Sequence, residues 1–98
     1  MISDQKPNVV FIMSDQHSRA VTGCYGDPLV RTSNLDQLAR EGVTFDSTYC
    51  ASPICTPSRM SMLTGRHPCQ NQVWTNTQIL DSGIPTFAHS MGAGGYWP

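Results

Sequence analysis

The chain has 98 residues, of which 39% are hydrophobic, and a formal net charge of -1 at pH 7. This hydrophobic content is typical of a globular protein, although a chain of this length buries only about 60 to 70% of the surface that it exposes when unfolded. A net charge close to zero offers no general attraction for nucleic acid or an anionic membrane, so we expect neither as a partner.

The N-terminus and the cysteines indicate a compartment. No apolar stretch approaches membrane-spanning length, and no basic segment followed by a hydrophobic segment opens the chain, so we predict a cytoplasmic location. Reduced thiols are then expected rather than disulfides. Cys24 and Cys50 are predicted as small core residues, and Cys69 as exposed. The absence of a C-x-x-C spacing and the scattered histidines argue against a zinc site.

The first predicted element is a strand over residues 8–13, a continuous apolar run rich in β-branched residues that is typical of a central parallel strand. The run ends at Asp15 and Gln16, and ligands of open α/β sheets gather at the carboxyl ends of strands. The Asp15 carboxylate and the Gln16 carbonyl oxygen suit a hard divalent cation. The alternative is an aspartate that caps a turn. We expect His17 to be a surface or hydrogen-bonded structural histidine, and the alternative is a position near the pocket, since it follows the proposed ligands.

A helix and a short strand are predicted next. The helix starts at a cap formed by Thr32 or Ser33 and ends at Gly42. Residues 43–46 then alternate between apolar and polar, which predicts a short strand. The apolar positions on one face of the helix are Leu35, Leu38 and Ala39.

Residues 49–54 are predicted to form a loop that leads to Cys55. Pro57 suits the first position of a helix because its φ is fixed near the helical value and it lacks an N–H that would be unpaired there. Cys55 then lies just outside the helix, where free amides and the positive end of the dipole attract anions. Arg59 adds a planar cation suited to tetrahedral oxyanions. Gly65 ends the helix, whose buried stripe is predicted as Met60, Leu63 and Thr64.

The C-terminal third predicts a loop and a last helix. Residues 71–82 are mixed and polar, which predicts a loop with some extended structure. Asn76 is a candidate for lining a substrate pocket. Trp74 is expected to pack on the sheet, with pocket lining as its alternative role. Pro85 opens a helix that runs to about Met91 and ends at the glycines beyond it.

The motif around Cys55 has an alternative interpretation, which is a structural cysteine ahead of an ordinary capped helix.

The string C-T-P-S-R, followed directly by M-S-M-L-T-G-R, resembles the signature of the type I sulfatases. Segments 23–26, 32–43 and 49–53 resemble the same family, so the resemblance covers nearly the whole chain. It implies an alkaline phosphatase-like α/β fold, with a central, largely parallel sheet flanked by helices. Residues 1–98 would form the truncated N-terminal portion of the catalytic domain, with further site residues downstream.

The resemblance also implies a function, the hydrolysis of small sulfate esters. In that family a formylglycine-generating enzyme, here the expected partner, oxidises the cysteine to an aldehyde whose hydrate is the nucleophile. The implied catalytic residues are Cys55 and Arg59. The implied metal ligands are Asp15, Gln16 and the modified Cys55, with Ca2+ as the expected metal and Mn2+ or Mg2+ as alternatives. The 98 residues alone are expected to be inactive.

Sulfatases often carry two adjacent aspartates where this chain has Asp15-Gln16. This pair resembles the choline-sulfatase-like branch and the related phosphonate monoester and phosphodiester hydrolases. Two alternatives therefore stand beside the sulfatase hypothesis. One is a phosphonate monoester or phosphodiester hydrolase with the same site, and the other is a non-catalytic product that serves at most as a substrate of the maturing enzyme.

Overall fold

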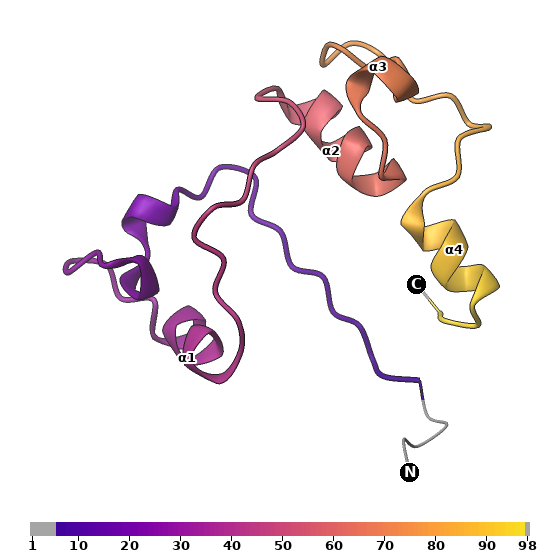
Figure 1. Cartoon of the computed structure of the whole chain (residues 1–98). Coiled ribbons are helices and arrows are strands. Elements are labelled where there is room, and N and C mark those ends of the chain that lie inside the picture. The colour runs from indigo at the N-terminus through magenta and orange to yellow at the C-terminus, as the bar shows by residue number, and fades with distance from the viewer. Residues whose placement is uncertain (1–5, 98) are drawn as a thin grey trace. The chain divides into compact units, whose positions relative to one another are not determined.

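The structure is a computed structural model that describes residues 6–97. It divides into two compact units, Met1–Thr44 and Phe45–Pro98. Figure 1 shows that helices and loops make up both units. The elements are two 3-10 turns, η1 (Arg19–Val21) and η2 (Gly23–Tyr25), and four α-helices, α1 (Ser33–Glu41), α2 (Cys55–Thr64), α3 (Pro68–Asn71) and α4 (Phe87–Ala93).

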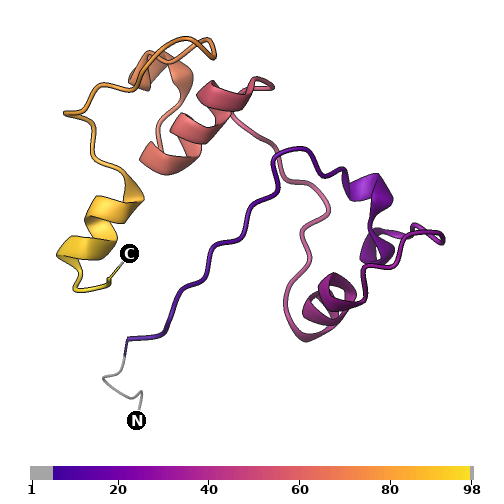
Figure 2. The same ribbon diagram turned by 180° about the vertical axis from the view of Figure 1, so that it is seen from behind.

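The predicted strand over residues 8–13 is wrong for this structure. The segment is extended, as both views of the ribbon show (Figure 1; Figure 2), but residues 6–97 contain no strand with which it could pair. Its side chains are exposed, 80% at Val10 and 87% at Ile12. A strand with apolar residues on both faces needs neighbouring strands and covering helices. The predicted α/β architecture with a central sheet is therefore not present in the part of the chain that is described.

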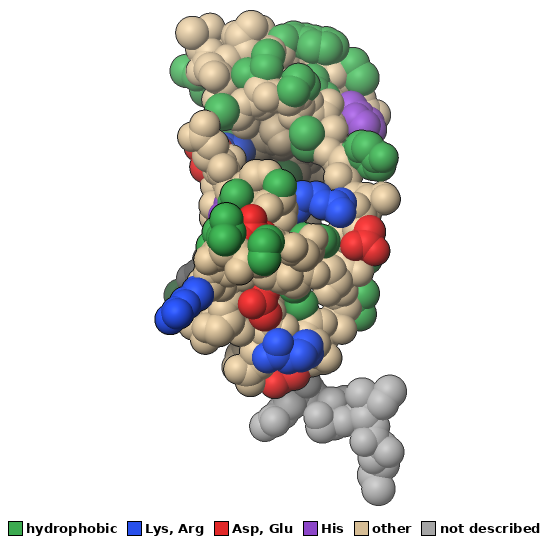
Figure 3. Space-filling view, turned by 90° about the vertical axis from the view of Figure 1, so that its left-hand side faces the viewer, with side chains coloured by type: hydrophobic (Ala, Val, Ile, Leu, Met, Phe, Trp, Pro, Cys, Tyr) green, Lys and Arg blue, Asp and Glu red, His purple; other side chains and the backbone are tan. Residues whose placement is uncertain are grey.

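The short strand predicted over residues 43–46 is also wrong, since these residues are exposed coil. The same reason applies, because Val43 is 79% exposed and has no sheet on which to pack. Without a sheet to cover them, many hydrophobic side chains stay on the surface, and Figure 3 shows such side chains beside charged ones on the drawn face.

The helix predicted between Thr32 and Gly42 is confirmed as α1. Thr32 is its N-cap residue, and the N–H of the C-cap residue Gly42 donates to the carbonyl of Leu38. The predicted apolar face is not buried, however, since Leu35 is 48% and Leu38 67% exposed. Gly42 therefore supplies a local stop signal at the end of α1, whereas the Thr32 side chain makes no capping hydrogen bond to the helix amides.

An exposed turn precedes α1. The Oδ1 atom of Asp27 accepts hydrogen bonds from the amides of Leu29 at 2.8 Å and Val30 at 2.9 Å. These bonds, that of Val30 foremost, hold the pKa of Asp27 below its ordinary value of 3.8. Because the pKa of Asp27 is lowered in the folded chain, its ionised carboxylate stabilises the turn at neutral pH. This stabilisation is lost as the pH falls through the lowered pKa.

The central helix of the second unit, α2, begins two residues earlier than predicted. Its N-cap residue is Ile54, and the first helical hydrogen bond runs from the Ser58 amide to the Ile54 carbonyl at 3.0 Å. Pro57 therefore occupies the third helical position rather than the first. At the third position its missing N–H still costs nothing, because amides in the first turn have no helical acceptor. Cys55 lies inside the helix at its first position, not outside it.

Gly65 ends α2 as predicted, with a φ of 66° in the left-handed region. The buried face of α2 differs from the predicted stripe. Pro57 and Ser61 are buried, whereas Met60, Leu63 and Thr64 are only half-buried. Both α3 and α4 contact α2. The fully buried Val73 follows α3 closely in the chain.

Two further helices complete the second unit. The short α3 was not predicted, although Pro68 at its start and the Gln70 side chain, which accepts from the His67 amide at 3.0 Å, are recognisable start signals. The predicted C-terminal helix is confirmed as α4, but it starts at Phe87, after Thr86 as N-cap, rather than at Pro85. The loop predicted over residues 71–82 is confirmed for residues 72–82, and Asn71 is the last residue of α3.

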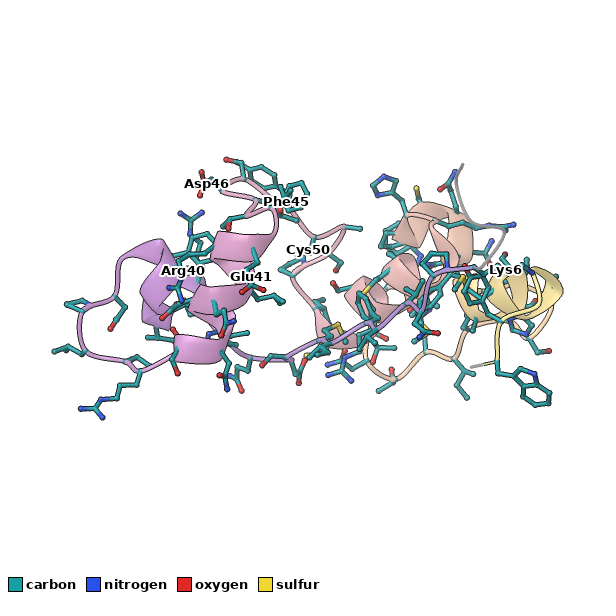
Figure 4. The ribbon with its side chains drawn as sticks, turned by 90° about the horizontal axis from the view of Figure 1, so that it is seen from below. Lys6, Arg40, Glu41, Phe45, Asp46 and Cys50 are labelled. Atoms are coloured by element: carbon teal, nitrogen blue, oxygen red, sulfur yellow. The ribbon has the colours of Figure 1, made fainter. Side chains whose placement is uncertain are left out.

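Three expected burials are wrong. Cys24 and Cys50 are exposed rather than core residues, and Figure 4 shows Cys50 in the loop after α1. Trp74 is 54% exposed and has no sheet on which to pack. Cys69 is exposed, as expected. No helix in the described residues is long and apolar enough to cross a bilayer.

Gly65 and Gly92 should respond in opposite directions to substitution by alanine, because only Gly65 has a positive φ. Gly65→Ala should weaken α2 by about 1 kcal/mol, because a Cβ is strained at its left-handed φ. Gly92→Ala should instead stabilise α4 by about 0.5 to 1 kcal/mol, because Gly92 lies inside a helix and a Cβ there meets nothing within 4 Å. Amide hydrogen exchange measures both opening free energies. Equal effects of the two substitutions would contradict the assigned role of Gly65.

Candidate functional site

The candidate site is the N-terminal turn of α2. Cys55 occupies the first helical position with an exposed, free thiol. The amides around it differ in their hydrogen bonds. That of Ile54 donates to Ser52 Oγ at 3.3 Å and that of Thr56 donates to Asn76 Oδ1 at 2.9 Å. Pro57 has no N–H, so the Cys55 amide is the one left without an acceptor among the described residues of this turn.

The Asn76 side chain acts as a long-range helix cap. Ile54, the N-cap residue by position, has an apolar side chain that cannot accept a hydrogen bond. Asn76, separated from Thr56 by 20 residues, supplies the missing acceptor. The sequence proposed Asn76 as a pocket residue, and the structure places its amide oxygen directly at the turn that carries Cys55.

The loop that presents Asn76 is closed by its own hydrogen bonds. Gln78 Oε1 accepts from the amides of Trp74 at 2.6 Å and Thr75 at 2.9 Å. The hydroxyls of Thr75 and Thr77 lie 3.0 Å apart on either side of Asn76. Because these bonds fix the turn, Asn76 is held in place from its own side as well as by Thr56.

Arg59 lies one helical turn after Cys55 and is half-buried. Residues four apart on a helix share a face, so the guanidinium stem and the thiol stem leave α2 on the same side. The positive end of the helix dipole adds to the charge of the guanidinium there. An open amide, a helix N-terminus and an arginine together suit a tetrahedral anion.

Asp15 and Gln16 are exposed at a bend that follows the extended N-terminal segment. They belong to the first unit and Cys55 to the second, so the structure describes the parts of the predicted metal site separately. Their oxygen donors fit a hard divalent cation in kind. Two residues are only part of a ligand set, and the described residues contain no group of three or more His, Cys, Asp or Glu that could hold a metal.

The three histidines make structural contacts, as expected for His17. Its Nε2 lies 2.7 Å from the hydroxyl of Thr22. His67 is the N-cap residue of α3, with a reciprocal pair of hydrogen bonds to its first turn. His89 Nδ1 accepts from the Thr86 amide at 3.1 Å at the start of α4.

Replacement of Asn76 tests the cap. Asn76→Ala should speed hydrogen exchange of the Thr56 amide and weaken the first turn of α2 by about 1 kcal/mol, because the amide loses its acceptor. Asn76→Asp, which retains an oxygen at the same place, is the matched control and should preserve the protection. Unchanged exchange in Asn76→Ala would show that the hydrogen bond does not stabilise the turn.

A sequence profile of the family described as Sulfatase matches residues 7–96. An uncharacterized sulfatase of Escherichia coli is 37% identical over 92 residues, and an ulvan-active sulfatase of Formosa agariphila is 42% identical over 91 residues. Human steryl-sulfatase is 38% identical over 88 residues. No solved structure matches the chain.

These alignments cover 94%, 93% and 83% of this chain, but only 18%, 18% and 15% of the respective relatives. The chain thus corresponds to a small part of each relative's length. The profile match includes the extended segment, α1 and the whole of α2 with Cys55. Because it spans nearly every residue, the chain belongs to the sulfatase family.

Proposed function

We propose that this chain is the N-terminal, cysteine-bearing part of an enzyme that hydrolyses small sulfate esters. The observation that carries the proposal is the exposed Cys55 at the first position of α2, whose own amide donates to no acceptor among residues 6–97 and which shares a face with Arg59. Family membership supports this reaction class, since the matched relatives are sulfatases. The isolated 98 residues are proposed to be inactive, since they span only 18% of relatives such as these.

The proposed nucleophile is the hydrate of formylglycine, which a formylglycine-generating enzyme would form from Cys55. One hydroxyl of the hydrate would attack sulfur as the bond from sulfur to the departing alcohol breaks. The second hydroxyl would then lose its proton, and the C–O bond to sulfate would break to restore the aldehyde, which an ordinary alcohol could not do. The chain's own residues position the substrate. The Cys55 amide and the Arg59 guanidinium bind the tetrahedral anion, and Asn76 fixes the direction of the turn from which position 55 projects.

A divalent cation is part of the proposal, with Asp15 and Gln16 as two of its ligands. Ca2+ is the first choice because both donors are oxygen atoms, and Mn2+ or Mg2+ are alternatives. When bound, the cation supplies positive charge that makes a hydroxyl more acidic near neutral pH. The modified Cys55 would be a third ligand, and the others would come from the part of the enzyme beyond this chain.

The Asp15-Gln16 pair leads us to place the enzyme near the choline-sulfatase-like branch, where phosphonate monoester and phosphodiester hydrolases are related. Both substrate classes present a tetrahedral anion to the turn of α2. Sulfate is favoured because the relatives named above are all sulfatases. The cytoplasmic location stays a prediction.

Substitution of Cys55 tests the nucleophile. In the full-length enzyme that carries this segment, produced together with a formylglycine-generating enzyme and supplied with Ca2+, Cys55→Ala should lower aryl sulfate turnover by about a thousandfold or more. Cys69→Ala, which also removes an exposed thiol of the second unit, should leave turnover unchanged. Mass spectrometry should find an aldehyde in place of the thiol at position 55. Full activity of Cys55→Ala would refute the proposal.

Substrate preference separates sulfate from phosphonate. The value of kcat/KM should be at least about tenfold higher for a nitrophenyl sulfate than for the matching nitrophenyl phosphonate, a difference of about 1.4 kcal/mol in transition-state binding. The two probes share a leaving group, so the comparison reports the transferred group alone. A preference for the phosphonate would instead support the related hydrolase.

A further inference from the structure

A polar network in the first unit connects the segment that follows Asp15 and Gln16 to α1. Its most buried member is Thr22, which is 4% exposed and joins η1 to η2. The Thr22 hydroxyl lies 2.7 Å from Nε2 of His17, and either atom can donate the hydrogen bond. The Thr22 carbonyl accepts from the amides of Tyr25 at 3.1 Å and Asp27 at 3.3 Å.

The network continues from Thr22 to the first turn of α1. The Gly23 amide donates to Thr32 Oγ1 at 2.8 Å, and that hydroxyl donates to Asp36 Oδ1 at 2.9 Å. Asp36 Oδ1 also accepts from the Cys24 amide at 2.7 Å. A Cβ at Gly23 would lie 2.6 Å from Asp36 Oδ2, so the approach is possible only for glycine. These contacts fix η2 against α1.

His17 connects the exposed N-terminal segment to the hydrogen-bonded network of η2 and α1, through its contact with Thr22. The chain before His17 is exposed. Residues 6–14 are extended and pair with no strand in the described part of the chain, and Asp15 and Gln16 form a bend. His17 follows Gln16 directly, so its hydrogen bond to a buried hydroxyl limits how far the bend at Asp15 and Gln16 can rotate. A ligand pair that is held before binding loses less conformational entropy when the cation arrives.

We propose that His17 and Thr22 are positioning residues that hold Asp15 and Gln16 in the orientation required for binding a divalent cation. This inference rests on the proposed function, because it takes these two residues as cation ligands. It assigns no ligand role to His17 or Thr22, which act only through the hydrogen bond between their side chains. Contacts behind metal ligands typically change metal affinity by about 10- to 100-fold when they are removed.

The experiment measures cation affinity without turnover. Calorimetric titration of CaCl2 into the metal-free, full-length enzyme that carries this segment gives the dissociation constant. Thr22→Val, which replaces the hydroxyl by a methyl group of similar size, should raise this constant at least about tenfold. Thr22→Ser retains the hydroxyl and should stay close to the parent value. Thr44→Val is the matched control, the same substitution at an exposed position of the same unit, and should change nothing.

His17→Ala breaks the same hydrogen bond from the exposed side and should raise the constant by a similar factor. It decides the question if Thr22→Val fails to fold, which circular dichroism will show. Unchanged affinity in a folded Thr22→Val, or in His17→Ala, overturns the positioning role while sulfate hydrolysis by the parent enzyme would leave the proposed function standing. No cation binding by the parent enzyme would overturn both the metal ligands and this inference.

Discussion

The N-terminal turn of α2 depends on one hydrogen bond, from the Thr56 amide to the side chain of Asn76. An isolated helix beginning at Cys55 would lack a side-chain cap, because Ile54 cannot accept a hydrogen bond. The Ser52 hydroxyl accepts a hydrogen bond from the Ile54 amide, and the Asn76 side chain accepts one from the Thr56 amide. Pro57 has no N–H that could donate. These arrangements leave the Cys55 amide as the open donor, at the residue where the proposed chemistry takes place.

The same device stabilises the other unit. There Asp36 reaches back over 12 residues to accept from the Cys24 amide, as Asn76 does for Thr56. Both are polar side chains that complete a turn distant in sequence. Such contacts matter more here than in a protein with a large core, because Val73 and Pro57 are the largest fully buried side chains among the described residues. Polar contacts and local helix signals, rather than extensive burial, define the structure of each unit.

The sequence predicted those parts of the structure that local signals determine. Gly42 and Gly65 end helices where expected, because the end of a helix depends on the conformation of a few adjacent residues. The cap by Asn76 and the bond between His17 and Thr22 were not predicted, since no local pattern marks a contact between a loop and a distant amide. The strand over residues 8–13 was predicted wrongly. Its continuous apolar pattern is typical of a strand that is covered on both faces, and residues 6–97 contain no sheet in which it could be covered.

That error bears on how the proposed site would assemble. Asp15 and Gln16 follow the extended segment, and Cys55 opens a helix in the other unit, so neither local structure alone brings the ligands to the nucleophile. Exposure of 80% at Val10 and 87% at Ile12 is unfavourable in water, and strand pairing in a longer polypeptide would remove it. The same pairing would orient the carboxyl end of the strand, where Asp15 and Gln16 lie. Burial of the apolar segment would then help to orient the proposed cation ligands, together with the hydrogen bond between His17 and Thr22, so the proposed site would depend on more of the fold than the motif around Cys55.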